Sequence, residues 1–133
     1  MIEGKSMEPK SNNSPKLTSF ESKEDNLHFE GVLDIEPKEL ADKVDQVLLI
    51  DVRQPEEFHG ELGHIPGSKL IVLDTLFDHL SELPKNQTVV FICRSGSRSA
   101  RAAAMALEEG HESVFNLKGG MILWNELHLE TEI

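Results

Sequence analysis

Residues 88–110 read TVVFICRSGSRSARAAAMALEEG, and this stretch decides the fold. Its beginning, 88–92, is an apolar run rich in β-branched residues, which is typical of a strand buried on both faces of a parallel sheet. Its end, 99–109, is rich in alanine and therefore favours a helix, with Gly110 suited to the C-terminal cap. The sequence predicts a buried strand, a short loop that starts at Cys93, and a helix.

Short apolar runs and helical patterns alternate on both sides of this stretch. Further strands are predicted at 47–50, 69–73 and 113–117, and further helices at 36–41 and 74–83. Alternation with short connections indicates a doubly wound α/β domain with a parallel sheet. Functional sites in such sheets lie at the carboxyl ends of the strands, which points to Asp51–Arg53 and to the residues from Cys93 onward.

Composition limits the classes of function. The 133 residues suit one domain, and 24 acidic against 13 basic side chains give a net charge of −11. This charge argues against nucleic acid and against anionic membrane surfaces as partners. Because neither an apolar run of membrane-spanning length nor a signal-peptide core is present, we expect a cytoplasmic protein.

Cysteine and histidine usage bears on metal and redox chemistry. The chain has one cysteine, Cys93, so internal disulfides and a Cys-rich zinc site are excluded. Its six histidines have no paired helical spacing. We therefore expect neither a metal nor a cofactor.

The first thirty residues differ from the rest. They are polar, contain the breaker-rich run 11–15, and have few apolar side chains. Such a segment cannot bury enough surface to offset the entropy lost on ordering its backbone. The sequence therefore predicts a flexible N-terminal tail or linker over 1–30 and a folded domain over 31–133.

The loop after Cys93 combines three features that stabilise an anion. Small residues let the chain curl so that successive amide N–H groups point inward; these are Ser95, Gly96, Ser97 and Ser99. The positive N-terminal end of the next helix faces the same space. Three of the thirteen basic residues lie here: Arg94, Arg98 and Arg101. The loop predicts a nucleophilic thiolate at neutral pH, whereas a lone cysteine elsewhere is more often a small buried apolar residue.

The spacing within the loop distinguishes two chemistries. Four residues separate Cys93 from Arg98. Phosphotyrosine-type phosphatases and the related arsenate reductases have one residue more, so that Ser99 stands at the position of their arginine. The shorter ring of amides suits a single sulfur atom better than a phosphoryl group. The phosphatase hypothesis is therefore the weaker one.

The chain resembles a single-domain rhodanese, a sulfurtransferase, from about Val32 to the C-terminus. Several motifs follow in the order of that family: 49–53 with 56–58, the turn 63–68, the loop 93–99, and 117–120 with Trp124. The resemblance implies a five-stranded parallel sheet with helices on both faces. This agrees with the alternation of predicted strands and helices.

The resemblance also implies a reaction and roles for residues. Cys93 would take the outer sulfur of thiosulfate or a related small anionic donor as a persulfide, and cyanide or a thiol would accept it. The loop amides from Arg94 to Ser99, those of Ser95, Gly96 and Ser97 included, would hold the terminal sulfur. Arg94 and Arg98 would attract the donor.

For two residues of the first motif, Arg53 and Asp51, more than one role is expected. Arg53 would line the substrate pocket, or else form a salt bridge to Glu56 or Glu57. Asp51 is expected to anchor the loop or to cap the next turn, and Ser99 to support the loop, rather than to touch substrate.

Two further predictions concern glycine and histidine. Gly119 and Gly120 would permit positive φ or a close backbone approach beside the active loop. His64, although it could act as a general base, is expected to be a turn residue whose ring bonds nearby backbone.

One function from a different class stays open. Rhodanese-like domains also serve as non-enzymatic binding or regulatory modules, and an acidic surface with a tail suits docking to a basic partner. A sulfur-acceptor protein in a relay is an open alternative as well. The intact Cys93 and full-length loop favour the enzyme.

Overall fold

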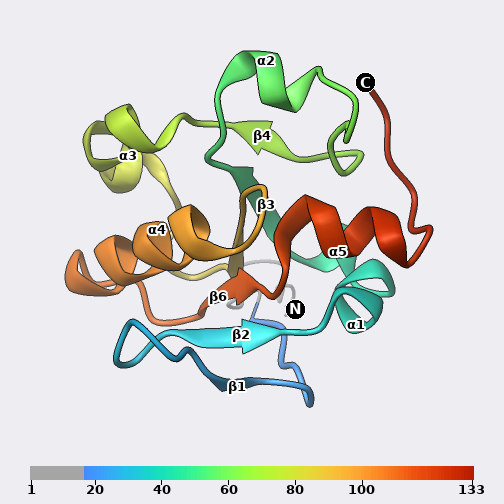
Figure 1. Ribbon diagram of the computed structural model, residues 1–133. Coiled ribbons are helices and arrows are strands. Elements are labelled where there is room, and N and C mark those ends of the chain that lie inside the picture. The colour runs from blue at the N-terminus through green and yellow to red at the C-terminus, as the bar shows by residue number, and fades with distance from the viewer. Residues whose placement is uncertain (1–16) are drawn as a thin grey trace, which may run out of the picture.

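The computed structural model describes residues 17–133, which form one mixed sheet with helices on both faces (Figure 1). The strand order is β1-β2-β6-β5-β3-β4. The strands are β1 (Glu24–Asp25), β2 (Leu33–Ile35), β3 (Leu48–Asp51), β4 (Lys69–Leu70), β5 (Val89–Ile92) and β6 (Val114–Leu117). Because β1 alone pairs antiparallel, the other five strands make the expected five-stranded parallel sheet.

The helices are short apart from the one that follows Cys93. They are α1 (Pro37–Ala41), α2 (Pro55–Phe58), α3 (Leu73–His79), α4 (Ser97–Glu108) and α5 (Gly120–Glu126). Both α1 and α2 start with proline, whose fixed φ suits the first helical turn. Gly110 follows α4 with φ +95°, in the left-handed conformation that ends helices. Within residues 17–133, no helix has the length and apolar character needed to cross a membrane.

Each face of the sheet has its own apolar core, as expected for a doubly wound domain. One core places Phe91 of β5 against Leu76 of α3 and Ala103 of α4. The other places Ile92 of β5 against residues of α1 and α5 that include Trp124. Successive β5 side chains therefore point to opposite cores, which explains why this strand is apolar along its whole length.

Residues 17–30 differ from the predicted tail. The Phe20 side chain is 2% exposed, lies in the core on the α5 side, and contacts Phe115 edge to face. The backbone N–H of Thr18 donates to the hydroxyl of Thr88 (2.7 Å), and β1 pairs with β2. Burying one phenylalanine contributes ~1.5–3 kcal/mol, and the backbone bonds of Thr18 and of β1 add to the attachment of this segment. The rest of the predicted tail, 1–16, lies outside the described residues.

Candidate active site

Cys93 directly follows β5 and lies at the carboxyl end of the sheet. Its side chain is buried in the core between the sheet and α4. The Sγ atom accepts a hydrogen bond from the backbone N–H of Gly96 (3.1 Å). Gly96 is the N-cap of α4 and has φ +106°, so the chain turns back and presents this amide to the sulfur. The N-terminal end of α4 therefore lies next to the Cys93 sulfur.

Ser99 also contacts the sulfur directly. Its Oγ lies 3.2 Å from Sγ of Cys93 and 2.5 Å from Oδ1 of Asn116, and the residue is fully buried. The sequence predicted loop support for Ser99; the structure shows that it also contacts the Cys93 sulfur. Asn116 was missed, although a lone amide within the apolar strand 114–117 is a signal that could have found it.

The start of the loop is held by the backbone of α5. The N–H of Met121 donates to the carbonyl of Cys93 (2.9 Å), and that of Ile122 to the carbonyl of Arg94 (3.0 Å). Gly119 and Gly120 have φ +74° and +57°, and a Cβ on Gly120 would lie 2.5 Å from the Arg94 carbonyl. Both the positive φ and the close backbone approach predicted here are confirmed.

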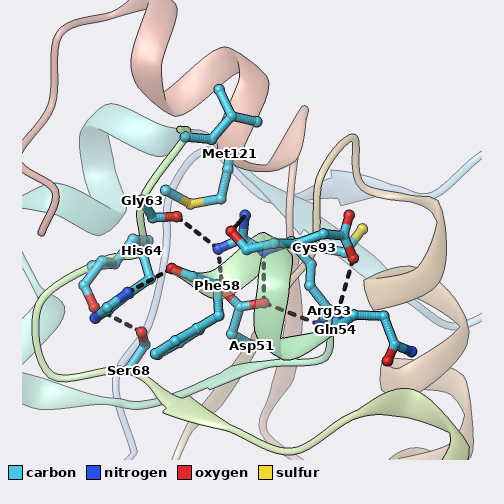
Figure 2. Close-up of polar contacts among 12 residues, drawn as sticks. Asp51, Arg53, Gln54, Phe58, Gly63, His64, Ser68, Cys93 and Met121 are labelled. Atoms are coloured by element: carbon cyan, nitrogen blue, oxygen red, sulfur yellow. Dashed lines mark hydrogen bonds and ion pairs between the residues drawn. The ribbon is translucent and has the colours of Figure 1, made fainter. Parts of the chain in front are cut away.

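Asp51 and Arg53 form a buried ion pair (Figure 2). The carboxylate of Asp51 accepts from Nε (2.9 Å) and Nη2 (2.8 Å) of Arg53. The guanidinium also donates to the carbonyls of Gly63 (2.8 Å) and Glu57 (3.2 Å). The alternative prediction, a salt bridge from Arg53 to the side chain of Glu56 or Glu57, was therefore wrong. Four of five guanidinium N–H groups are used, and Asp51 holds this arginine rather than the Cys93 loop.

Arg98 pairs with Glu57 across the site. Its two terminal nitrogens donate to the two carboxylate oxygens at 2.8 and 2.9 Å. The hydrogen bond from Arg98 lowers the pKa of Glu57 to about 2, although partial burial opposes this shift. The same hydrogen bond raises the pKa of Arg98, and the nearby Cys93 side chain adds to that effect. The ion pair therefore ties α4 and the Cys93 loop to α2.

Two cavities flank the loop, and Cys93 lines neither of them. One of about 240 Å³ is lined by Arg53, Arg94 and residues 56–62 in part. The other, about 400 Å³, is lined by the loop residues 95–98, by Asn116 and by the segment 26–29. Cys93 itself is 0% exposed. The predicted nucleophile thus lies buried beneath the loop, and we expect that the loop must move before a donor can reach it.

His64 is a structural turn residue, as predicted. Its Nδ1 lies 2.8 Å from the carbonyl oxygen of Phe58, and the two rings stack (Figure 2). Its backbone exchanges two hydrogen bonds with Glu132. His64 therefore fastens the C-terminal segment to the turn and is 6% exposed.

Comparison with known proteins decides the family. The Rhodanese-like domain family model matches residues 36–127. The chain belongs to this family. The match begins with the helix α1 and ends after α5, so it includes the Cys93 loop and the ion pairs around it, while the segment 17–35 lies outside it.

Curated relatives of this rhodanese-like chain carry sulfurtransferase names. A sulfurtransferase of Allochromatium vinosum is 42% identical over 85 residues, which cover 64% of this chain and 77% of that protein. The thiosulfate sulfurtransferase GlpE of Pseudoalteromonas translucida is 33% identical over 92 residues, or 69% and 85%. These relatives place the chain in a sulfurtransferase family.

A solved structure agrees with the fold. The rhodanese-like domain protein of Staphylococcus aureus superposes with a TM-score of 0.62 at 35% identity, covering 75% of this chain and 98% of that one. The rhodanese-like α/β fold expected from the motifs is therefore confirmed.

Proposed function

We propose that this rhodanese-like protein transfers a sulfane sulfur from thiosulfate or a related anionic donor to a thiophilic acceptor through a persulfide on Cys93. One observation carries the proposal. The Cys93 sulfur lies at the start of α4 with the amide of Gly96 and the hydroxyl of Ser99 within hydrogen-bond distance. Donors aimed at a sulfur atom stabilise the negative charge of a thiolate or persulfide.

The reaction is a double displacement. The Cys93 thiolate attacks the outer sulfur of thiosulfate, a new S–S bond forms, and sulfite leaves with the electron pair of the bond that breaks. Cyanide or a thiolate then attacks the terminal sulfur of the persulfide, and Cys93 leaves as a thiolate. The sulfur stays at the same oxidation level throughout, so no external oxidant or reductant is needed.

Two arginines offer charge to the donor. Arg94 is exposed, lines the smaller cavity and has no carboxylate partner among residues 17–133. Arg98 is half-buried and can exchange Glu57 for an anion. Arg53 has most of its donors engaged, so we assign the first attraction of the donor to Arg94.

Phosphate-ester hydrolysis is less well supported. A Cys-based phosphatase needs an arginine aimed at the phosphoryl group bound over the cysteine. Here the loop from Cys93 to Arg98 is one residue shorter than in those enzymes, and Ser99 stands at the position of their arginine. Hydrolysis of a phenyl phosphate is therefore expected to stay at the background rate.

Intact mass after thiosulfate treatment tests the proposal. A gain of one sulfur, about 32 Da, is expected; reductant should reverse it and Cys93→Ser should abolish it. Ser81→Ala, which changes an exposed serine outside the site, serves as the control and should still gain the sulfur. Thiocyanate formation from thiosulfate and cyanide should follow the same pattern.

A protein that gains no mass, or gains it equally without Cys93, would contradict the proposal. In that case the binding module becomes the better hypothesis. The binding-module hypothesis predicts that the protein captures a basic partner protein, and that Cys93→Ser captures it equally well.

A further inference from the structure

A line of polar side chains runs from the buried sulfur of Cys93 to the surface. Ser99 lies against the sulfur, and Asn116 lies against Ser99. The Asn116 amide nitrogen donates to Oδ1 of Asp34 on β2 (2.9 Å), which also accepts from Asn26 (2.9 Å). The family match starts at residue 36, so Asp34 and Asn26 belong to the part of the chain outside it.

The orientation of the Asn116 amide follows from its neighbours. Its Nδ2 donates to two acceptors, Oδ1 of Asp34 (2.9 Å) and the carbonyl of Gly96 (3.1 Å). Neither acceptor can donate a proton in return, since one is a carboxylate oxygen and the other a backbone carbonyl. Reversing the amide would place its oxygen against both of them. The Oδ1 atom therefore faces Ser99.

Ser99 has one hydroxyl proton and two acceptors for it. Oδ1 of Asn116 lies 2.5 Å away and Sγ of Cys93 lies 3.2 Å away. A hydroxyl gives its one proton to one acceptor at a time, so that while it bonds Asn116 an Oγ lone pair faces the sulfur. A thiol can donate its proton to this lone pair, whereas a thiolate cannot. To stabilise a thiolate, the hydroxyl must rotate and give up its bond to Asn116.

We propose that Asn116 is a positioning residue that sets the charge state of Cys93 by competing with the sulfur for the single proton of Ser99. With the proton on the Asn116 side, the site favours the thiol. With the hydroxyl turned to the sulfur, the site favours the thiolate or persulfide, and Oδ1 of Asn116 loses its donor. The inference deepens the proposed function and rests on it, because sulfur transfer needs the thiolate.

Other charged groups lie around the sulfur, and of these only Asp34 is bonded by Asn116 itself. They are Arg98 with Glu57 on the α4 and α2 side, Arg53 with Asp51 after β3, and the exposed Arg94. From β2 the nearest charge is Asp34, which reaches the sulfur only through Asn116 and Ser99. None of these groups contacts the Ser99 hydroxyl among the hydrogen bonds of residues 17–133.

Ultraviolet titration of the thiolate tests the inference without sulfur transfer. The chain has one cysteine and no tyrosine, so the thiolate band is free of interference from tyrosinate. In Asn116→Ala the competing acceptor is gone, and the midpoint of the titration is expected to fall by about one pH unit, a tenfold change. In a Ser99→Ala background the same Asn116→Ala change should leave the midpoint where it is.

Asn125→Ala is the matched control. Its amide also donates to two carbonyls, those of Leu62 (3.0 Å) and Met121 (2.8 Å), and it contacts neither Ser99 nor the sulfur. The control should lower the unfolding midpoint without moving the titration. Asn116→Ser, whose hydroxyl is too short to reach Ser99, replaces the alanine variant if that variant does not fold.

An unchanged midpoint in Asn116→Ala, or an equal shift with and without Ser99, would overturn the inference. The first result would mean that Asn116 does not compete with the sulfur for the Ser99 proton. The second would mean that the substitution shifts the midpoint through a general change of structure. Both are independent of whether the wild-type protein forms a persulfide. Failure here is thus distinct from failure of the mass experiment on Cys93.

Discussion

Two arginine–carboxylate pairs flank the Cys93 loop, and they differ mainly in burial. Asp51 and Arg53 have side chains that are 0% and 1% exposed. Glu57 and Arg98 are 26% and 35% exposed. Each pair has two short N–H···O bonds, and both arginines were expected from the sequence to serve the donor.

The difference in exposure suggests different roles for the two pairs: the buried pair Asp51–Arg53 supports the fold, and the half-exposed pair Glu57–Arg98 can open. Removing one partner of a buried pair leaves an uncompensated charge in the core, which is strongly destabilising. A half-exposed pair gains little from its Coulomb energy, since water screens and solvates both groups. We therefore propose that Arg98 exchanges its carboxylate for an anionic substrate, whereas Arg53 holds the turn after β3.

Arg53→Ala gives the largest expected effect. It leaves the Asp51 carboxylate buried without its counter-charge and with only the backbone N–H of residue 53 as a donor, so the free energy of unfolding should fall by about 3–5 kcal/mol. Urea denaturation followed by tryptophan fluorescence measures this, since Trp124 is buried in the core. A loss below about 1 kcal/mol would show that water reaches Asp51 and that the two pairs are equivalent.

Arg98→Ala should affect activity more than stability. The free energy of unfolding should change by less than about 1 kcal/mol, while sulfur transfer becomes slower. The change leaves the Glu57 carboxylate alone near the sulfur, where it repels a dianionic donor. We expect kcat/KM for thiosulfate to fall about tenfold, mainly through KM. Normal turnover in this variant would remove Arg98 from donor binding and leave Arg94 alone in that role.

Glu57→Gln weakens the link between α2 and the loop, because it removes the charge and one of the two acceptor oxygens for Arg98. Because Cys93 is buried beneath this loop, its alkylation by iodoacetamide should become about three- to fivefold faster as the loop opens more often. Glu56→Gln, a change of an exposed neighbour that does not bond Arg98, should leave the rate unchanged. Equal rates in both variants would mean that the ion pair does not limit access to the sulfur.

The pH dependence of stability gives the smallest expected effect. The hydrogen bond from Arg98 holds the pKa of Glu57 at about 2, below the ordinary 4.5. Its stabilisation is therefore present above about pH 4.5 and is lost as pH falls toward about 2. For a half-exposed pair we expect less than about 1 kcal/mol.

Urea midpoints of wild type and Glu57→Gln at about pH 7 and about pH 3 isolate this contribution, since the other carboxylates cancel. The difference between the two proteins should shrink at the lower pH. A constant difference would show that Glu57 stabilises the fold through contacts other than its charge.

The sequence predicted most of the fold because long apolar runs and an alanine-rich helix have strong periodic signals. The strands β3, β5 and β6 and the helix α4 all lie where their patterns indicated. The short strands β1 and β2 were missed, since two or three residues carry no period that can be recognised. Residues 17–30 were assigned to the tail for the same reason: their single anchor, Phe20, has no pattern around it.

In the site, sequence alone determined the chemistry that is available: one cysteine, a loop of small residues and a helix that starts beside it. Only the tertiary structure decided the partners of these groups. It buried Cys93, paired Arg53 with Asp51 and Arg98 with Glu57, and brought Asn116 to Ser99 from a strand seventeen positions away. Local spacing determines which groups the chain carries to the sheet edge, but burial and hydrogen-bond geometry depend on segments that meet only after folding.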